Sequence, residues 1–349
     1  MRAFLKNSQA AGDASVGDRP RPEAGPGEVV LQVAGCGICG SDLHAVASDP
    51  GFEFMRPPVV MGHEFTGTIA ALGEGSARFS VGDRIIVISI QGCGNCLVCR
   101  QGDTHICGAK RIVGLHYDGG LAEYVVVAER HLVPVPPALD LAVAALAEPL
   151  SVAVHAVLGR STIRPGDRVI VSGPGPIGLF CGRLAQLAGG EVLMTGTESD
   201  AALRLPLAER FGFRTVNVDR DDVEAVIADH ARGAGADAWI EASGAGPAFG
   251  AAIAGVRPGG TVTVVALFAG AVTFRPTDAV RRELSILFSY ASQYGDYLTA
   301  LRLLEDGSVD GSPLITSYAL DDAGAAFDDA RAGAVVKAIV VPGKPATSV

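Results

Sequence analysis

Hydrophobic positions are spaced differently in the first part of the chain and in its middle. Residues 28–34 alternate between apolar and polar side chains, and residues 65–73 and 85–88 form two more short runs of the same kind. Glycine and proline separate these runs, so each is predicted to be a short strand that ends in a turn. Many short strands with glycine turns indicate a compact, barrel-like β domain.

In the middle of the chain, short apolar runs alternate with helical patterns. Residues 167–172, 192–195, 238–244 and 259–265 are predicted strands, and residues 179–185 begin a helix. Strands that alternate with helices favour a parallel, doubly wound sheet, so we expect an α/β fold here. Near the end of the chain a helical pattern returns, followed by one apolar closing strand.

Composition and charge narrow the class of protein. A chain of 349 residues with 48% hydrophobic and 19% charged side chains is long enough for two globular domains. Its net charge of −10 argues against a nucleic-acid partner, because no surplus of basic residues exists to neutralise phosphates. No uninterrupted apolar run is long enough for a membrane span, and residues 1–6 lack the apolar core of a signal peptide. We therefore expect a cytoplasmic protein with no membrane partner.

The seven cysteines are unusual for a cytoplasmic protein unless they bind metal or react. Five of them have ligand-like spacing or context, and the other two, Cys36 and Cys181, are expected to pack in the core. The first candidate ligand, Cys39, lies in a glycine-rich segment.

The Cys39 segment has a counterpart in His63 and Glu64, which follow a glycine. A thiol, an imidazole and a carboxylate are the ligand set of a zinc ion that keeps one position open for chemistry. Ser41 and His44 would project beside the Cys39 thiolate. The alternative is a cysteine in a tight turn and an unrelated His–Glu pair.

Four further cysteines are Cys93, Cys96, Cys99 and Cys107. Four thiolates within fifteen residues match a closed tetrahedral zinc site, whose metal would supply folding energy to this loop. An iron–sulfur cluster is the alternative. His105 is expected on the surface, because four sulfurs already fill the coordination shell.

A glycine-rich motif follows the first predicted strand of the α/β region and begins a helix, which is the context that gives such a motif meaning. Its first glycine makes the turn, the second lets a pyrophosphate approach and the third lets the helix pack on the strand. The helix N-terminus then favours the phosphates. The expected cofactor contacts are Gly173, Gly175, Pro176, Ile177 and Gly178.

The next predicted strand ends at Gly196, where a carboxylate that reads the ribose is expected. Glu198 follows two residues later, so we expect Gly196, Thr197 and Glu198 to contact the adenosine ribose of NAD. NADP stays open, although Arg204, the nearest arginine in the sequence, is a turn of helix too far away. Leu267 follows the strand that ends where the nicotinamide would lie.

Together, residues 39–44, 62–64 and 119–124 and the four-cysteine segment resemble the zinc-dependent medium-chain dehydrogenase/reductase family. Residues 147–156 are similar to its branch of polyol (sorbitol), butanediol and threonine dehydrogenases. The resemblance implies that Glu148 faces the catalytic zinc. The alternative is a carboxylate that only stabilises a helix N-terminus.

The resemblance also implies the architecture and the cofactors. A GroES-like, β-rich catalytic domain would comprise residues 1–150 and 290–349. A Rossmann domain with a doubly wound parallel sheet, residues 151–289, would be inserted in it. Two zinc ions per protomer, one catalytic and one structural, and a homodimer or homotetramer are expected.

The implied activity is that of a zinc-dependent NAD(P)-dependent alcohol dehydrogenase. It would transfer hydride between a secondary alcohol of the polyol or diol class and NAD(P), and so interconvert the alcohol and its ketone. Ser41 would take the substrate proton, His44 would lie further along the proton relay, and Glu148 would be the third catalytic residue.

Two other functions are weighed. Oxidation of an amino alcohol, as by L-threonine 3-dehydrogenase, is the first, but that branch carries Thr at Ser41 and Asp-Pro-Phe at residues 148–150. A binding or structural protein of this fold without turnover is the second. Sorbitol itself is doubted, since sorbitol dehydrogenases carry an aromatic residue and an arginine where this chain has Ala45 and Ser289.

Overall fold

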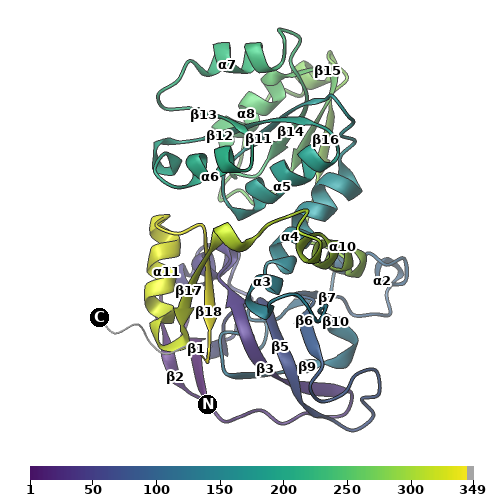
Figure 1. Cartoon of the computed structure of the whole chain (residues 1–349), viewed down its shortest axis with the longest axis vertical. Coiled ribbons are helices and arrows are strands. Elements are labelled where there is room, and N and C mark those ends of the chain that lie inside the picture. The colour runs from purple at the N-terminus through teal and green to yellow at the C-terminus, as the bar shows by residue number, and fades with distance from the viewer. Residues whose placement is uncertain (344–349) are drawn as a thin grey trace. The chain divides into compact units, whose positions relative to one another are not determined.

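The computed structural model describes residues 1–343, so the last six residues of the predicted catalytic domain, 344–349, lie outside the described part (Figure 1). The chain forms two compact units. The first unit comprises Met1–Pro149 and the chain from Ser292 onward, and the second comprises Leu150–Ala291. Each unit has its own sheets and its own core.

The first unit contains a seven-stranded sheet in the order β10-β6-β5-β3-β18-β17, and β9 also pairs with β3. The last strand of the described residues, β18, runs antiparallel to β3 and parallel to β17, so it is part of the first unit. The strands are β3 (Glu28–Gly37), β5 (Glu64–Leu72), β6 (Arg84–Val87), β9 (Tyr124–Ala128), β10 (Leu132–Pro134), β17 (Ile315–Ala319) and β18 (Lys337–Val341).

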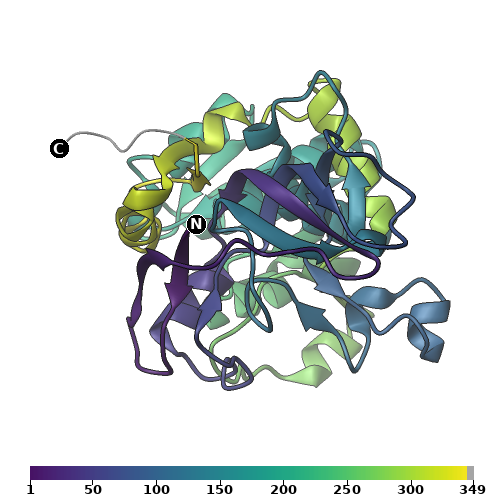
Figure 2. The ribbon, with the colours of Figure 1, turned by 90° about the horizontal axis from the view of Figure 1, so that it is seen from below.

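Smaller sheets and helices complete this unit. The order β2-β1-β4 makes one small sheet, and β7 pairs with β8 in another. Helix α11 packs beside β2 and β18, as both views show (Figures 1 and 2). The bounds are β1 (Arg2–Lys6), β2 (Ala14–Asp18), β4 (Val59–Val60), β7 (Ile90–Gln91), β8 (Arg111–Ile112), α1 (Gly40–Ala47), α2 (Leu97–Arg100), α3 (Leu141–Ala144), α10 (Tyr294–Glu305) and α11 (Ala323–Ala332).

The second unit contains one six-stranded sheet in the order β13-β12-β11-β14-β15-β16. Every neighbouring pair in it is parallel, which confirms the predicted α/β sheet. The strand order reverses between β11 and β14, the point at which open α/β sheets bind nucleotides. The strands are β11 (Arg168–Ser172), β12 (Glu191–Gly196), β13 (Arg214–Asn217), β14 (Ala236–Glu241), β15 (Val256–Val264) and β16 (Ser285–Phe288).

The helices of this unit connect these strands. Apolar side chains such as Trp239 and Phe249 form a buried cluster between β14 and α8. The bounds are α5 (Pro176–Leu187), α6 (Arg204–Arg210), α7 (Val223–His230), α8 (Gly246–Gly255) and α9 (Pro276–Val280), with the short turn η4 (Glu198–Asp200) after β12. The short turns of the first unit are η1 (Thr104–Ile106), η2 (Glu129–His131), η5 (Ser312–Leu314) and η6 (Leu320–Asp322).

A continuous helical stretch joins the units, from Leu141 through α4 (Ala147–Val154) to the π-helical turn η3 (His155–Arg160). By length and composition alone, Leu141–Arg160 could cross a membrane. However, 67% of its most apolar window is buried inside the protein, as is typical of a core helix. Cys36 and Cys181 are also fully buried, which confirms their prediction as core residues.

Candidate active site and cofactor loop

Strand register brings the two halves of the first candidate metal site together. Antiparallel pairing of β3 and β5 places Gly37 opposite Glu64, so Cys39, just beyond β3, lies beside His63. The ligand atoms of Cys39, His63 and Glu64 all lie within 4.8 Å of one another. This spacing fits one ion bound at about 2.0–2.3 Å from each ligand, so the three side chains fit a zinc ion.

Close backbone packing fixes the segment that carries His63. Gly62 has φ +91°, and a Cβ atom there would lie 2.5 Å from the Cys36 sulfur. A Cβ on Gly119 would lie 2.1 Å from the Gly62 carbonyl oxygen, which also accepts the Gly120 N–H at 2.9 Å. These three glycines therefore let the chain at 119–120 pack directly against the backbone that precedes His63.

Sequence reasoning missed Asp42, a fully buried carboxylate in the first turn of α1. One of its oxygens accepts the Cys39 N–H at 2.9 Å, and the other lies 3.4 Å from His63 Nδ1. Burial alone lowers the pKa of His63, but Asp42 and the Cys39 thiol raise that pKa well above its ordinary value. Asp42 thus orients the ring so that Nε2 is the metal-binding nitrogen. The spacing of a capping box from Cys39 to Asp42 was the available signal.

The second missed residue is Lys337, at the start of β18. Its ammonium pairs with Glu64 Oε2 and donates to the Ile38 carbonyl at 2.9 Å. Both charged side chains are buried, with Lys337 4% and Glu64 1% exposed. Burial lowers the pKa of Lys337, but Glu64 and then the Cys39 thiol raise that pKa above its ordinary value. A Cβ on Gly37 would lie 2.2 Å from Glu64 Oε2, so only glycine leaves room for this pair.

Glu148 lies in the first turn of α4 and is 6% exposed. Its Oε1 accepts the Ser89 hydroxyl at 2.6 Å, and the backbone N–H of Ser89 donates to the Tyr297 hydroxyl at 3.1 Å. Burial, and then the charge of Glu64, raise the pKa of Glu148 to about 7. The charge of Glu64 thus affects the pKa of Glu148, yet Glu148 is not one of the three possible metal ligands Cys39, His63 and Glu64.

The surroundings of Glu148 also differ from those of a free helix start. Helix α3 ends only three residues before α4 begins, and the Glu148 N–H donates to the Ala145 carbonyl at 3.3 Å. A carboxylate whose only role is to stabilise a helix dipole lies beside unsatisfied backbone N–H groups. The N–H of Glu148 is already satisfied, so stabilisation of the helix N-terminus explains little of the placement of Glu148.

Ser41 and His44 lie on α1 at different depths. The Ser41 hydroxyl oxygen is 3.5 Å from His63 Nε2. One turn later, His44 Nδ1 lies 2.6 Å from Asp49 Oδ2, and its side chain is 56% exposed. Ser41 therefore lies beside the metal ligands, and His44 lies one turn further on at the solvent.

The four predicted cysteine ligands converge in one loop. The sulfurs of Cys93 and Cys99 are 4.0 Å apart, and those of Cys96 and Cys107 are 3.8 Å apart. A tetrahedral ion with Zn–S bonds of about 2.3 Å requires roughly 3.8 Å between sulfurs, so the site fits zinc. Backbone N–H groups, with that of Asn95 first, lower the pKa of Cys93 to about 6, which favours its thiolate.

The prediction for His105 was wrong. It lies on η1 and is only 4% exposed. The short turn that leads into Cys107 folds this side chain inward instead of leaving it on the surface.

The glycine motif forms the turn between β11 and α5. Gly173 has φ +92°, and a Cβ on Gly178 would lie 1.8 Å from the Gly173 carbonyl oxygen. Gly175 is the N-cap of α5, and the space around its absent side chain is open. Open space before the N–H groups of a helix start fits a pyrophosphate. Buried Glu241, which sequence reasoning missed, accepts the N–H groups of Ser243 and Gly244 beside Gly173.

The residues after β12 give a physical reason for the missing carboxylate. A Cβ on Gly196 would lie 2.9 Å from the Leu205 side chain and 3.0 Å from the Pro174 ring, so a larger side chain would require both to shift. Glu198 accepts the Asn217 amide at 2.9 Å and pairs with Arg220.

This pairing corrects the prediction about arginines. Arg220, on the loop after β13, is the arginine beside Glu198, whereas Arg204 pairs with Asp200 at 3.2 Å. Leu267 lies in the loop after β15 and is 73% exposed.

Comparison with known proteins gives matches along most of the chain. Residues 25–137 match the alcohol dehydrogenase GroES-like domain, and residues 176–306 match the zinc-binding dehydrogenase domain. The chain is 33% identical to sorbitol dehydrogenase of Halalkalibacterium halodurans over 346 residues, which cover 98% of this chain and 99% of the relative.

Solved structures agree with this result. A protein of Sinorhizobium meliloti described as a zinc-binding dehydrogenase, with NADP bound, superposes with a TM-score of 0.89 at 31% identity, covering 98% of this chain and 99% of its own. The 2R,3R-butanediol dehydrogenase of Bacillus subtilis gives 0.88 at 29% identity, covering 98% and 99%. These matches confirm the predicted combination of a GroES-like and a Rossmann domain.

Proposed function

Because the chain belongs to the zinc-dependent medium-chain dehydrogenase/reductase family, we propose that it interconverts a secondary alcohol of the polyol or diol class and its ketone, with NAD as hydride carrier. The observation that carries this proposal is the trio Cys39, His63 and Glu64 with the Ser41 hydroxyl 3.5 Å from His63 Nε2. A proton acceptor beside an open metal site is what oxidation of an alcohol requires.

Zinc, when bound by these residues, supplies a Lewis acid for the substrate oxygen, and the nicotinamide supplies the hydride acceptor. The protein holds and moves the proton. Ser41 accepts it from the substrate hydroxyl, and His44, paired with Asp49 and exposed, releases it toward solvent. Asp42 keeps the His63 ring oriented, and Lys337 neutralises one of the buried carboxylates.

The substrate class rests on residues and on relatives. Ser41 and the Glu-Pro-Leu sequence at 148–150 differ from the residues of the threonine branch. The two named dehydrogenases described above act, by name, on a polyol and a diol. Ala45 is buried in the core, so its small size says little about the length of the substrate that the site accepts.

The test is a panel of polyols, diols, hydroxy acids and threonine, assayed with NAD and with NADP by the absorbance of the reduced nicotinamide. Best turnover with a polyol or diol supports the proposal, and best turnover with threonine supports the amino-alcohol alternative. If the protein contains its full complement of zinc but turns over no compound of the panel, the proposal is refuted and a non-catalytic protein is favoured.

We also propose NAD over NADP, because Glu198 provides a carboxylate two residues after Gly196, the position where the ribose-reading carboxylate is expected. Arg220 beside it is the observation that favours NADP, since an arginine can bind a 2′-phosphate. A preference for NADP of tenfold or more in kcat/KM, about 1.4 kcal/mol, would refute the choice of NAD. Glu198→Gln should weaken that preference for NAD, and Arg220→Gln should leave it or strengthen it.

We further propose a cytoplasmic homodimer or homotetramer. Strand β16 is the last in the order of its sheet, and Phe288 at its end is 66% exposed. An edge strand with an exposed aromatic side chain is suited to pair with a second copy. Sedimentation of the wild type and of Phe288→Lys tests this: a monomeric wild type contradicts the proposal, and dissociation of the variant supports it.

A further inference from the structure

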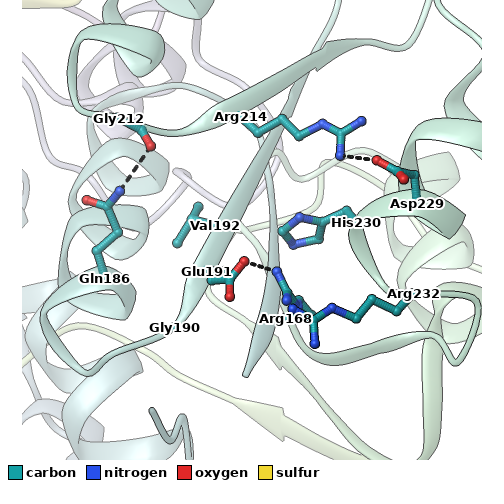
Figure 3. Close-up of a pocket in the computed structure, with 10 residues that line it drawn as sticks. All are labelled: Arg168, Gln186, Gly190, Glu191, Val192, Gly212, Arg214, Asp229, His230 and Arg232. Carbon is teal, nitrogen blue, oxygen red and sulfur yellow. Dashed lines mark hydrogen bonds and ion pairs between the residues drawn. The ribbon is translucent and has the colours of Figure 1, made fainter. Parts of the chain in front are cut away.

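One pocket of the nucleotide unit lies at the N-terminal ends of the strands β11, β12 and β13, whereas the glycine loop follows the C-terminal end of β11. Arg168, Glu191 and Arg214 are the first residues of β11, β12 and β13, and all three line a cavity of about 520 Å³ (Figure 3). The glycine loop follows the far end of β11. Five residues of strand at about 3.3 Å each separate the two by roughly 15 Å. The pocket is therefore distinct from the predicted NAD site.

The lining of this pocket is basic in a chain whose net charge is −10. Arg168 pairs with Glu191, and Arg214 pairs with Asp229 at 2.6 Å. Arg232 is a third guanidinium in the lining, so three positive charges face two negative ones.

The two carboxylates are the more exposed members of their pairs. Glu191 is 55% exposed against 13% for Arg168, and Asp229 is 73% exposed against 45% for Arg214. Exposed ion pairs contribute only about 0–1 kcal/mol, so an incoming anion can displace these carboxylates at small cost.

A buried imidazole lies among the arginines. His230, at the end of α7, extends toward β11 and β12 between Arg168 and Arg214 (Figure 3). It is 6% exposed, and its Nε2 is a buried nitrogen without a hydrogen-bond partner. Its ring also hydrogen-bonds to the backbone of Val169. Since a neutral imidazole has one donor and one acceptor, Nε2 is an unused acceptor if the other nitrogen donates to Val169.

We propose that this pocket binds the phosphate group of a small hydroxylated phosphomonoester, or free phosphate. Guanidinium groups form bidentate hydrogen bonds with phosphate oxygens, which suits Arg168, Arg214 and Arg232. A hydroxyl of the ligand, on phosphorus or on its carbon chain, donates to His230 Nε2. The volume is in the range of small-molecule sites, about 300–1,000 Å³, so a polyol phosphate fits.

The test is calorimetric titration of the zinc-loaded protein, saturated with NAD, with glycerol 2-phosphate, which has no secondary hydroxyl to oxidise, and with inorganic phosphate and sulfate, all at neutral pH. Saturation with NAD occupies the glycine loop, so it separates the two sites. We expect one phosphate-containing ligand per chain, and at least tenfold weaker binding of sulfate, which has no O–H to donate to His230. Tighter binding of glycerol 2-phosphate than of phosphate would identify an organic ligand, and the reverse would identify free phosphate.

Substitutions locate the site. Arg214→Gln and Arg232→Gln change side chains at the pocket and should each weaken binding at least tenfold. Arg275→Gln is the matched control, because Arg275 is a 79% exposed, ion-paired arginine of the same unit outside the pocket. Equal affinities in all three variants, or loss of phosphate binding on saturation with NAD, would overturn the proposal. Equal binding of sulfate and phosphate would overturn the role of His230.

Discussion

Replacing Lys337 by methionine should destabilise the zinc-free protein more than the zinc-loaded protein. The variant keeps most of the side-chain volume but leaves Glu64 buried, near Glu148, without its positive partner. Removing one member of a buried ion pair costs about 3–5 kcal/mol of unfolding free energy, because the remaining charge is uncompensated.

Zinc changes this result because it returns positive charge to Glu64. If zinc recovers about 2 kcal/mol of the loss, linkage requires that Lys337→Met bind it roughly 30-fold more tightly than wild type does. A metal held so firmly should also exchange ligands more slowly, so turnover should fall. Lys337→Met should therefore have a lower unfolding free energy than wild type and, at the same time, a higher affinity for zinc.

The assay is urea unfolding with and without chelator, together with competition for zinc against a chelating dye. Lys6→Met is the matched control. Lys6 is 1% exposed, and its Nζ donates to the carbonyls of Ala10 and Val46 and to the Ser48 hydroxyl. Its loss should therefore destabilise the protein equally with and without zinc. The same behaviour in Lys337→Met, with unchanged zinc affinity, would refute the reasoning.

Three further predictions follow from the same structure. Elemental analysis should find two zinc ions per chain. Cys39→Ser should fold, retain one zinc ion and lose turnover, whereas Cys96→Ser should yield little folded protein; a single zinc ion in the wild type would contradict this. Glu148→Gln should keep most of its zinc and lose at least tenfold in kcat, and unchanged turnover would reduce Glu148 to a structural residue. Gly178→Ala should abolish NAD binding in a fluorescence titration, because its Cβ would lie 1.8 Å from the Gly173 oxygen. Gly250→Ala in α8, where the added Cβ has open space, is the control, and a normal NAD affinity in Gly178→Ala would be the contrary result.

Sequence reasoning succeeded where the chemistry is contained in a short segment. The four cysteines, the glycine motif and the pair His63–Glu64 are local patterns, and the backbone conformation of one loop brings each set together. The alternation of strands and helices predicted the parallel sheet for the same reason.

It failed where a partner arrives from far along the chain. Lys337 contacts Glu64 only because β18 pairs with β3. The apolar sequence pattern of β18 gives no indication of a buried ion pair. Arg220 reaches Glu198 from the loop after the next strand, β13, although Arg204 is nearer in the sequence. Side-chain direction, and not separation along the chain, decides such contacts.

The three glycines around residue 62 have a consequence for redesign of this enzyme. Residues 119 and 120 lie between β8 and β9. A side chain at 119 would displace the backbone before His63, and one at 120 would clash with the ring of Phe65, the residue after Glu64. Selection for new substrates at these positions would therefore also select, unintentionally, for metal retention. Most members of a library randomised there should lose their zinc before their specificity can be judged.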